Sequence, residues 1–319
     1  MILIDFSGIL HRAVHTSRTE MEDNIGFVEH KILTMVKNVV SMFGGSKQNP
    51  VVLAIDSKPT WRAKFYQENK PVYPEYENET YKGKRTRDES IPWDEIYEMN
   101  NKVLEALKLH SDYHVVAVEE CEADDIIAVL AKDCFKRKET CWIVSSDKDF
   151  KQLQNEPYVT IYDPLKQAFV PQIDVVRFKE IHCMIGDKSD NILAIKPRLG
   201  EKTAEKLYPM LTETLATNPD MREKYKFNQN LIDFDFIPEN IQINILENWN
   251  KQEHSFDGIQ LIKVFKQYGL NSIINDIVKF KLSDEKRDTK LNTYHTKKEE
   301  LNEYKNKTIN TFFGDEDDN

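Results

Sequence analysis

Apolar residues in the first half of the chain alternate between short continuous runs and longer stretches with helical spacing. Four short runs predict buried strands: residues 1–5, 51–55, 114–118 and 141–144. Three longer stretches place apolar side chains on one helical face: residues 27–43, 92–107 and 123–135. We therefore predict an α/β fold, in which right-handed crossovers build a mainly parallel central sheet flanked by helices on both faces.

The second half of the chain has a different pattern. Beyond about residue 185, runs of β-branched residues become rare, and helical periods remain over residues 203–211, 238–249 and 259–268. From residue 283 onward Lys, Glu, Asn and Asp dominate, which is typical of a solvated tail. We predict three parts: an α/β domain over residues 1–185, a smaller helical domain over 186–285 and a polar tail over 286–319.

Composition narrows the class of protein. The 319 residues are 40% hydrophobic and 31% charged, which provides enough apolar surface for a core. Mean hydropathy is −0.60 and no run approaches the ~18 apolar residues of a spanning helix, so we expect no membrane association. The four cysteines form no Cys-x-x-Cys pair, which argues against a zinc ribbon or a disulfide framework and favours the reducing cytoplasm.

Acidic residues follow all four predicted strands. Asp5 ends the first run, Asp56 follows the second, Glu119 and Glu120 follow the third, and Asp147 follows the fourth. Because the carboxyl ends of parallel strands meet at one rim of an open α/β sheet, we expect these carboxylates to gather there. The net charge of −10 does not exclude a nucleic-acid partner, since bound cations would neutralise such a cluster.

Further acids extend this rim, and they lie just after the fourth strand and in the first turn of a predicted helix: Asp149, Glu122, Asp124 and Asp125. Singly, each is typical of a helix cap or a turn. Together they would repel one another unless some were protonated or cations neutralised them. No cluster of His or Cys accompanies them, so we expect an all-oxygen site that suits Mg²⁺ or Mn²⁺ and not zinc. A two-metal carboxylate site of this kind hydrolyses phosphodiesters.

Two other classes of protein fit part of this pattern. An apolar strand followed by Asp147-Lys148-Asp149 is also typical of haloacid-dehalogenase-like phosphatases, in which the first Asp is the nucleophile. That family places Thr or Val where this chain has Phe150. The other alternative is a catalytically silent DNA-binding scaffold, which would have no need of a repulsive acidic rim. Isolated histidines are more often structural, and no role is expected for four of them: His11, His15, His110 and His182.

Three acidic motifs occur in the order and spacing of one family: Glu122-Ala-Asp-Asp, Ser146-Asp-Lys-Asp-Phe and Gly186-Asp-Lys-Ser-Asp-Asn. With Asp5 and Asp56 upstream, they resemble the 5′-nuclease (flap endonuclease) superfamily over roughly residues 1–280. The segment 230–238 resembles the T-even phage ribonuclease H branch of that superfamily. The resemblance implies a PIN/5′-nuclease-like fold with a C-terminal helical domain.

This resemblance implies a divalent-metal-dependent 5′-to-3′ exonuclease and flap endonuclease that removes RNA primers during lagging-strand DNA replication. Its implied substrates are nicked or branched duplex DNA and RNA/DNA, in the host-cell cytoplasm if the protein is phage-encoded. Two Mg²⁺ ions are implied, with Mn²⁺ able to substitute. The implied metal ligands are Asp5, Asp56, Glu122, Asp124, Asp125, Asp147, Asp149, Asp187 and Asp190.

Residues 58–91 are rich in basic and aromatic side chains, among them Trp61, Tyr66 and Tyr76. These residues alone fit either an ordinary charged surface loop or a single-stranded nucleic-acid site that uses phosphate contacts and base stacking. The position of the segment, directly after a strand that ends in a metal-site acid, favours the second. The resemblance implies a helical arch over the site, in which three basic residues hold the scissile phosphate: Arg62, Lys82 and Arg85.

Residues 195–207 resemble the helix–three-turn–helix of the family, whose glycine-rich loop offers backbone amides to duplex phosphates and can hold K⁺. Here Arg198 stands where the pattern has its first glycine, so Arg198 and Lys202 can contact phosphate directly. An ordinary helix start is the alternative interpretation. The implied DNA-binding residues are Lys196, Arg198, Gly200, Lys202 and Thr203.

Residues 306–313 resemble a sliding-clamp-binding peptide, in which an aliphatic residue lies three positions before an aromatic pair. Ile309, Phe312 and Phe313 occupy these positions, and Asn306 stands where the pattern has Gln. A short 3₁₀ turn would place the three apolar side chains on one face, where they could fill a pocket of the clamp. The alternative partner for this aromatic and acidic end is a single-stranded-DNA-binding protein.

Overall fold

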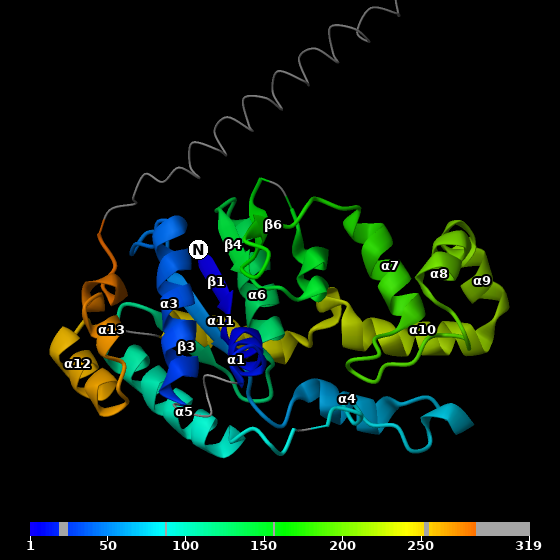
Figure 1. Ribbon diagram of the computed structural model, residues 1–319. Coiled ribbons are helices and arrows are strands. Elements are labelled where there is room, and N and C mark those ends of the chain that lie inside the picture. The colour runs from blue at the N-terminus through cyan, green and yellow to red at the C-terminus, as the bar shows by residue number, and fades with distance from the viewer. Residues whose placement is uncertain (19–24, 87, 156, 252–254, 285–319) are drawn as a thin grey trace, which may run out of the picture.

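A six-stranded sheet lies at the centre of the molecule, with strand order β3-β2-β1-β4-β5-β6 (Figure 1). The computed structural model describes residues 1–18, 25–86, 88–155, 157–251 and 255–284. The first five strands pair in parallel, and β6 runs antiparallel to β5. This confirms the predicted α/β fold. The strands are β1 (Ile2–Asp5), β2 (Val51–Ile55), β3 (His114–Ala117), β4 (Cys141–Val144), β5 (Val159–Asp163) and β6 (Ala168–Phe169).

Helices cover both faces of the sheet and continue beyond it. The α-helices are α1 (Phe6–His15), α3 (Gly26–Met42), α4 (Trp61–Asn69), α5 (Trp93–His110), α6 (Ala123–Lys136), α7 (Val175–Ile185), α8 (Glu201–Leu207), α9 (Leu211–Thr217), α10 (Pro219–Ile232), α11 (Glu239–Asn250), α12 (Gly258–Gln267) and α13 (Asn271–Ile274). The 3₁₀ helices are η1 (Pro74–Tyr76), η2 (Lys148–Leu153), η3 (Tyr208–Met210), η4 (Phe234–Phe236) and η5 (Ile277–Phe280). Among the described residues, no helix has the length and hydropathy needed to cross a bilayer.

Apart from Asp5 at the end of β1, the central strands β1, β2 and β4 are apolar because helices exclude water from both of their faces. Every residue of β1 and β4 is buried. In the parallel register Asp5 pairs with Ala54, and Ile4 pairs with Val144. The chain therefore leaves β1, β2 and β4 at the same rim of the sheet.

Several elements are not predicted by the hydrophobic pattern, and α1 shows why. Asp5 ends β1 and also caps α1, because its Oδ1 accepts a hydrogen bond of 2.8 Å from the backbone nitrogen of Gly8. Because β1 passes into α1 without a turn, no turn signal in the sequence separates the strand from the helix. A Cβ at Gly8 would lie 2.3 Å from Asp5 Oδ2, so glycine leaves the room that this carboxylate occupies.

Two large hydrophobic cores lie on opposite faces of the sheet. The first lies between the sheet and α1, α3 and α5, and it also includes Leu261 and Phe265 of α12 and Phe280 of η5. The second lies between the sheet and α6, and it includes Ile241 and Ile245 of α11. The helices α11 to α13 therefore belong to the cores of the α/β unit, although the predicted boundary at 185/186 places them in a separate helical domain.

A third core joins the predicted arch to the helices that follow the sheet. It contains Tyr66 and Tyr76 from the arch together with Phe227 and Leu231 of α10. The Tyr66 and Phe227 rings meet edge to face, with centroids 5.1 Å apart. Because Tyr66 and Tyr76 are buried, as is Trp61, the expectation that these aromatic side chains stack on nucleic-acid bases is wrong. Tyr66 and Tyr76 pack against Phe227 and so attach the arch to α10, which lies next to α4 in Figure 1.

One buried carboxyl in α3 gives a stability prediction. Glu29 is 2% exposed, its Oε1 has no hydrogen-bond partner among the described residues, and burial raises its pKa to about 8. Between the unfolded-state pKa near 4.5 and about 8 the folded state holds a proton that the unfolded state has lost. The free energy of unfolding should therefore fall as pH rises through this window. In Glu29→Gln this part of the pH dependence should vanish, as thermal unfolding between pH 6 and 9 will measure.

Candidate metal centre

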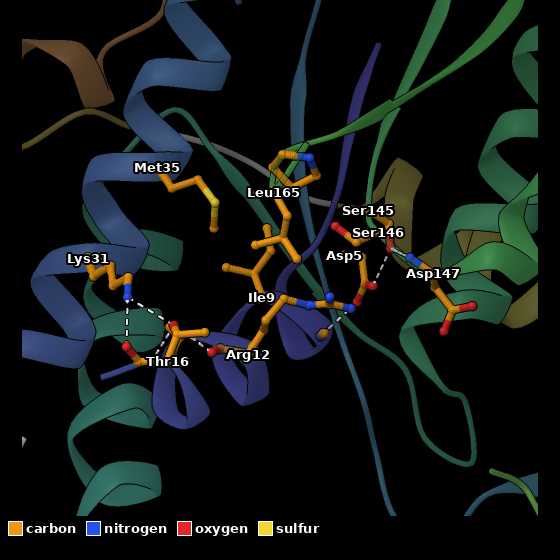
Figure 2. Close-up of a pocket in the computed structure, with 13 residues that line it drawn as sticks. Asp5, Ile9, Arg12, Thr16, Lys31, Met35, Ser145, Ser146, Asp147 and Leu165 are labelled. Atoms are coloured by element: carbon orange, nitrogen blue, oxygen red, sulfur yellow. Dashed lines mark hydrogen bonds between the residues drawn. The ribbon is translucent and has the colours of Figure 1, made fainter. Parts of the chain in front are cut away.

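One serine connects the ends of β1 and β4, where two of the acids lie. Ser145 Oγ donates to Asp5 Oδ2 at 2.7 Å and accepts a hydrogen bond of 3.0 Å from the backbone nitrogen of Asp147. Figure 2 shows the Asp5 and Asp147 side chains on either side of Ser145. Asp56, directly after β2, accepts from the backbone nitrogen of Ala123 at 2.7 Å and so connects this rim to the start of α6.

These acids lie close enough to perturb one another. Burial raises the pKa of Asp5 to about 6, and the charges of Asp56 and Asp147 add to the effect. Burial also raises the pKa of Asp124 well above its ordinary value, with further contributions from Asp5 and Asp147. The group combines buried Asp5 and partly buried Asp124 with exposed Asp56 and Asp147. Carboxylates gathered in this way without enough positive charge are the donor set that a divalent cation neutralises. The residues at this rim therefore fit such an ion.

A second group lies beside the first and contains a histidine. Asp149, His182 and Asp187 each offer one ligand atom, and these atoms all lie within 4.8 Å of one another. Burial raises the pKa of Asp149 to about 6, and the charges of Asp147 and Asp187 add to it. Burial acts to raise the pKa of Asp187 too, but hydrogen bonds from His182, Lys148 and Ser189 hold it well below the ordinary value. The sequence-based prediction of a metal site with oxygen ligands alone did not include His182.

A glycine at the end of α7 places Asp187. Gly186 has φ +69°, and a Cβ there would lie 2.3 Å from the carbonyl oxygen of Ile192. The chain turns at this glycine, and Asp187 then pairs with Ile192 through backbone hydrogen bonds of 2.7 and 3.0 Å. His182 lies on the inner face of α7, in the apolar run Ile181-His-Cys-Met. A histidine inside such a run, five residues before an acid, is the signal that sequence reasoning missed.

Basic residues of the arch contact the acids of this rim. Lys82 Nζ lies 2.5 Å from Glu122 Oε1 and 3.8 Å from Asp190 Oδ2. Arg85 pairs with Asp190 Oδ1 at 2.6 Å. The Tyr81 hydroxyl lies between the two carboxylates, within hydrogen-bond distance of Glu122 at 2.9 Å and of Asp190 at 3.0 Å, and it can donate to either. The structure thus brings Lys82 and Arg85 to the site, and it adds Tyr81.

Arg62 and Asp125 lie beneath the rim instead. Arg62 is 3% exposed, and its guanidinium lies 2.7 Å from Asp125 Oδ1 and 3.2 Å from Glu122 Oε2. Its Nε donates to the carbonyl oxygen of Leu231 at 3.0 Å. Asp125 Oδ2 accepts from the Trp61 indole at 3.0 Å and from the backbone nitrogen of Glu122 at 2.9 Å. Protein groups therefore occupy both carboxylate oxygens of Asp125, and the Arg62 guanidinium is enclosed.

The predicted duplex-binding loop is exposed and lies away from the acids. Lys196, Arg198, Gly200, Lys202 and Thr203 are all exposed at the start of α8. Gly200 is the N-cap residue of α8, and Arg198 takes the left-handed conformation, with φ 59°, where the family pattern has glycine. The predicted clamp-binding residues lie outside the described residues.

A small cavity of about 100 Å³ opens beside the acids, between α1, α3 and the turn after β5. Figure 2 shows Asp5 and Asp147 on one side and Ile9, Met35 and Leu165 forming an apolar wall. Arg12 lines the same cavity and is exposed.

Comparisons with known proteins agree with this geometry. A family model described as 5′-3′ exonuclease, N-terminal resolvase-like domain, matches residues 1–182. A second, described as T4 RNase H, C terminal, matches residues 198–280. The first covers more than half of the chain and includes the candidate metal ligands Asp5 to Asp149. The second includes the predicted duplex-binding residues from Arg198 onward.

Individual relatives and solved structures point the same way. Ribonuclease H of Enterobacteria phage T4 is 30% identical over 312 residues, which cover 87% of this chain and 95% of that protein. Flap endonuclease Xni of Shewanella loihica is 27% identical over 217 residues, covering 64% and 73%. A structure of the phage T5 flap endonuclease with DNA and metal ions shares the fold, with TM-score 0.55, 14% identity, and coverage of 88% of this chain and 98% of that one. The resemblance carried by the acidic motifs is thereby confirmed: the chain belongs to the 5′–3′ exonuclease family of nucleases.

Proposed function

We propose that this protein is a divalent-metal-dependent 5′-to-3′ exonuclease and flap endonuclease, which hydrolyses phosphodiester bonds in nicked or branched DNA and RNA/DNA duplexes. Family membership supports the reaction class. The observation that carries the proposal is the acidic rim, where buried Asp5 and partly buried Asp124 and Asp149 all have pKa values above the ordinary range. Removal of RNA primers during DNA replication in the cytoplasm is the biological role that fits this reaction and the T4 relative.

The rim residues divide between two ions, for which we propose Mg²⁺, with Mn²⁺ as a substitute. Two such ions, when bound, activate water and stabilise both oxygens of an in-line phosphoryl displacement. The first ion would be held by the acids after β1, β2 and β4 and by the start of α6: Asp5, Asp56, Glu122, Asp124 and Asp147. The second would be held by Asp149, Asp187 and Asp190. Asp125 supports Glu122 from below through its backbone contact.

The arch residues supply positive charge that can move to the substrate. Lys82 and Arg85 pair with Glu122 and Asp190, which are also proposed metal ligands. Cations bound at these acids would weaken both ion pairs, because they compete for the same carboxylates. Lys82 and Arg85 would then be free to orient the scissile phosphate. Tyr81, which bridges the two acids, is placed to do the same through its hydroxyl.

One assay separates this function from its alternatives. The purified protein is incubated with 5′-labelled flap and nicked duplexes, with Mg²⁺ or with a chelator. We expect cleavage near the flap junction with Mg²⁺ and none with chelator. A phosphatase would instead hydrolyse small phosphate esters through an aspartyl-phosphate at Asp147, and a silent scaffold would bind the duplex without cutting it. Either result would contradict the proposal.

The exposed loop before α8 is proposed as the duplex-binding surface. Arg198 and Lys202 are its two charges to be tested, and Lys196 and Thr203 lie beside them in the sequence. Replacing Arg198 and Lys202 together by Ala should weaken duplex binding and flatten its salt dependence by about one to two units of slope. Binding titrations at several salt concentrations measure this. The matched control replaces Lys263 and Lys266 of α12, which are exposed at the opposite end of the molecule in Figure 1. Equal effects of the two pairs would contradict the assignment.

The C-terminal segment is proposed as the attachment point for a sliding clamp, through Ile309, Phe312 and Phe313. Deleting residues 306–319 should leave cleavage of a short flap unchanged and abolish stimulation by the cognate clamp on a loaded substrate. Calorimetry of a 304–319 peptide against the clamp is the direct test, with a peptide carrying Ala at both Phe positions as control. Absence of heat at high micromolar peptide would contradict the motif, and binding to the single-stranded-DNA-binding protein would support the alternative partner.

A further inference from the structure

His182 lies between two acids of the rim and is itself enclosed. The side chain is 3% exposed and projects from α7. Its Nε2 lies 3.2 Å from Asp187 Oδ2, and its Nδ1 lies 3.7 Å from Asp149 Oδ1. Neither Nδ1 of His182 nor Oδ1 of Asp149 has a hydrogen-bond partner in the part of the chain that the structure describes. Two buried polar atoms that face each other at 3.7 Å without a hydrogen bond are unusual, because buried polar groups normally replace their lost hydration with hydrogen bonds.

The partners of Asp187 determine which nitrogen of His182 carries the proton. Asp187 also pairs with Lys148 Nζ at 2.8 Å and accepts from the backbone nitrogen of Ser189 at 2.7 Å. These contacts favour the ionised carboxylate, which only accepts hydrogen bonds. The proton in the His182–Asp187 contact therefore lies on Nε2. In the neutral imidazole, the lone pair of Nδ1 then points toward Asp149 Oδ1.

This arrangement is the one that ligating histidines adopt in proteins. There, one ring nitrogen binds the ion and the other donates to a carboxylate, which fixes the tautomer and the orientation of the ring. Donor atoms 3.7 Å apart can both lie about 2.0–2.2 Å from an ion between them. An imidazole donor moves the preference of a site toward transition metals, whereas Mg²⁺ prefers oxygen donors alone.

We propose that His182 Nδ1 and Asp149 Oδ1 form a nitrogen-containing position for a divalent transition ion such as Mn²⁺ or Co²⁺, with Asp187 orienting the imidazole. The proposal rests on the proposed function only in that Asp149 and Asp187 belong to the proposed metal set. It predicts that this enzyme binds Mn²⁺ at its second position more tightly than an all-carboxylate site would, and that His182 sets this preference over Mg²⁺.

The direct test is pulsed electron paramagnetic resonance on the full-length protein with one equivalent of Mn²⁺. A coupling from directly bound ¹⁴N is expected in the native protein and in His110→Gln, which changes a histidine at the far end of α5. His182→Gln should lose the coupling, and calorimetry should show Mn²⁺ affinity lowered roughly tenfold or more with Mg²⁺ affinity far less affected. A second measurement needs no variant: histidine labelled with ¹⁵N should convert the ¹⁴N coupling into a ¹⁵N coupling.

Absence of nitrogen coupling in the native protein, or its persistence in His182→Gln, would overturn the proposal. In either case, Mg²⁺-dependent cleavage of the flap substrate would leave the proposed function intact. Loss of cleavage with both metals in the native protein would contradict the proposed function, whatever the nitrogen signal. A native spectrum without Mn²⁺–nitrogen coupling would also identify His182 as a structural partner of the two acids, which is the alternative role.

Discussion

Asn in place of Asp124 is expected to lower the rate of phosphodiester cleavage by about a thousandfold or more and, at the same time, to raise Tm in the absence of metal. The first effect follows because a metal ligand contributes several kcal/mol to stabilising the transition state, and ~4 kcal/mol corresponds to about three orders of magnitude. The second follows because burial and the charges of Asp5 and Asp147 make the Asp124 carboxylate unfavourable without a cation.

Single-turnover cleavage of a labelled flap and thermal unfolding in chelator measure the two effects. Added Mg²⁺ should also raise Tm less in Asp124→Asn than in the native protein, since bound ligand stabilises by mass action. Asp133→Asn is the matched control on the same helix, where the carboxylate pairs with Arg137 near the surface. It should cleave normally. Cleavage by Asp124→Asn at the native rate would contradict the metal-site assignment.

Met in place of Arg62 should destabilise the protein by about 3–5 kcal/mol, the typical result of removing one partner from a buried ion pair. Arg62 contacts Asp125, Glu122 and the carbonyl oxygen of Leu231, and its guanidinium also lies 4.6 Å from the centre of the Trp61 ring. Removing it leaves two buried carboxylates without this charge. Urea unfolding followed by circular dichroism measures the loss.

A double-mutant cycle tests the cause. Combining Arg62→Met with Asp125→Asn should destabilise less than the sum of the two single changes, because the second change removes the charge that the first leaves unpaired. Arg177→Met is the control, since Arg177 pairs with Glu205 in solvent and should have little effect. If Arg62 held the scissile phosphate and nothing else, the variant would keep its stability and lose only cleavage.

The position of the site follows from sequence because topology and chemistry agree there. Parallel strands bring their carboxyl ends to one rim, and the acids after them must then lie together. The choice between Asp124 and Asp125 does not follow, because both lie in the first turn of one helix and differ only in the direction they face. Trp61 and Arg62, which lie more than sixty residues earlier in the sequence, bind the Asp125 carboxylate. Asp124 is therefore the residue of the two that can serve the metal site.

The roles of His182 and of the buried aromatic residues of the arch also depend on contacts with residues far away in the sequence, which a local pattern does not predict. A lone histidine in an apolar run looks structural, and only the packing of α7 against η2 brings it to Asp149, which lies 33 positions earlier. Tyr66 and Tyr76 lie in a charged segment whose composition is typical of an exposed loop. Their burial depends on Phe227, on a helix that the hydrophobic pattern does not predict.

The return of the chain to its first core has a consequence for biosynthesis. Leu261, Phe265 and Phe280 fill the core beside α3 and α5, and the backbone nitrogen of Leu282 donates to Asp112 at 2.7 Å. A nascent chain that has emerged from the ribosome only as far as residue 185 contains all six strands of the described sheet but lacks Asp187, Asp190 and one wall of its first core. That core is therefore complete only after residues 258–282 have emerged, and a chain released earlier would expose apolar surface to chaperones and proteases.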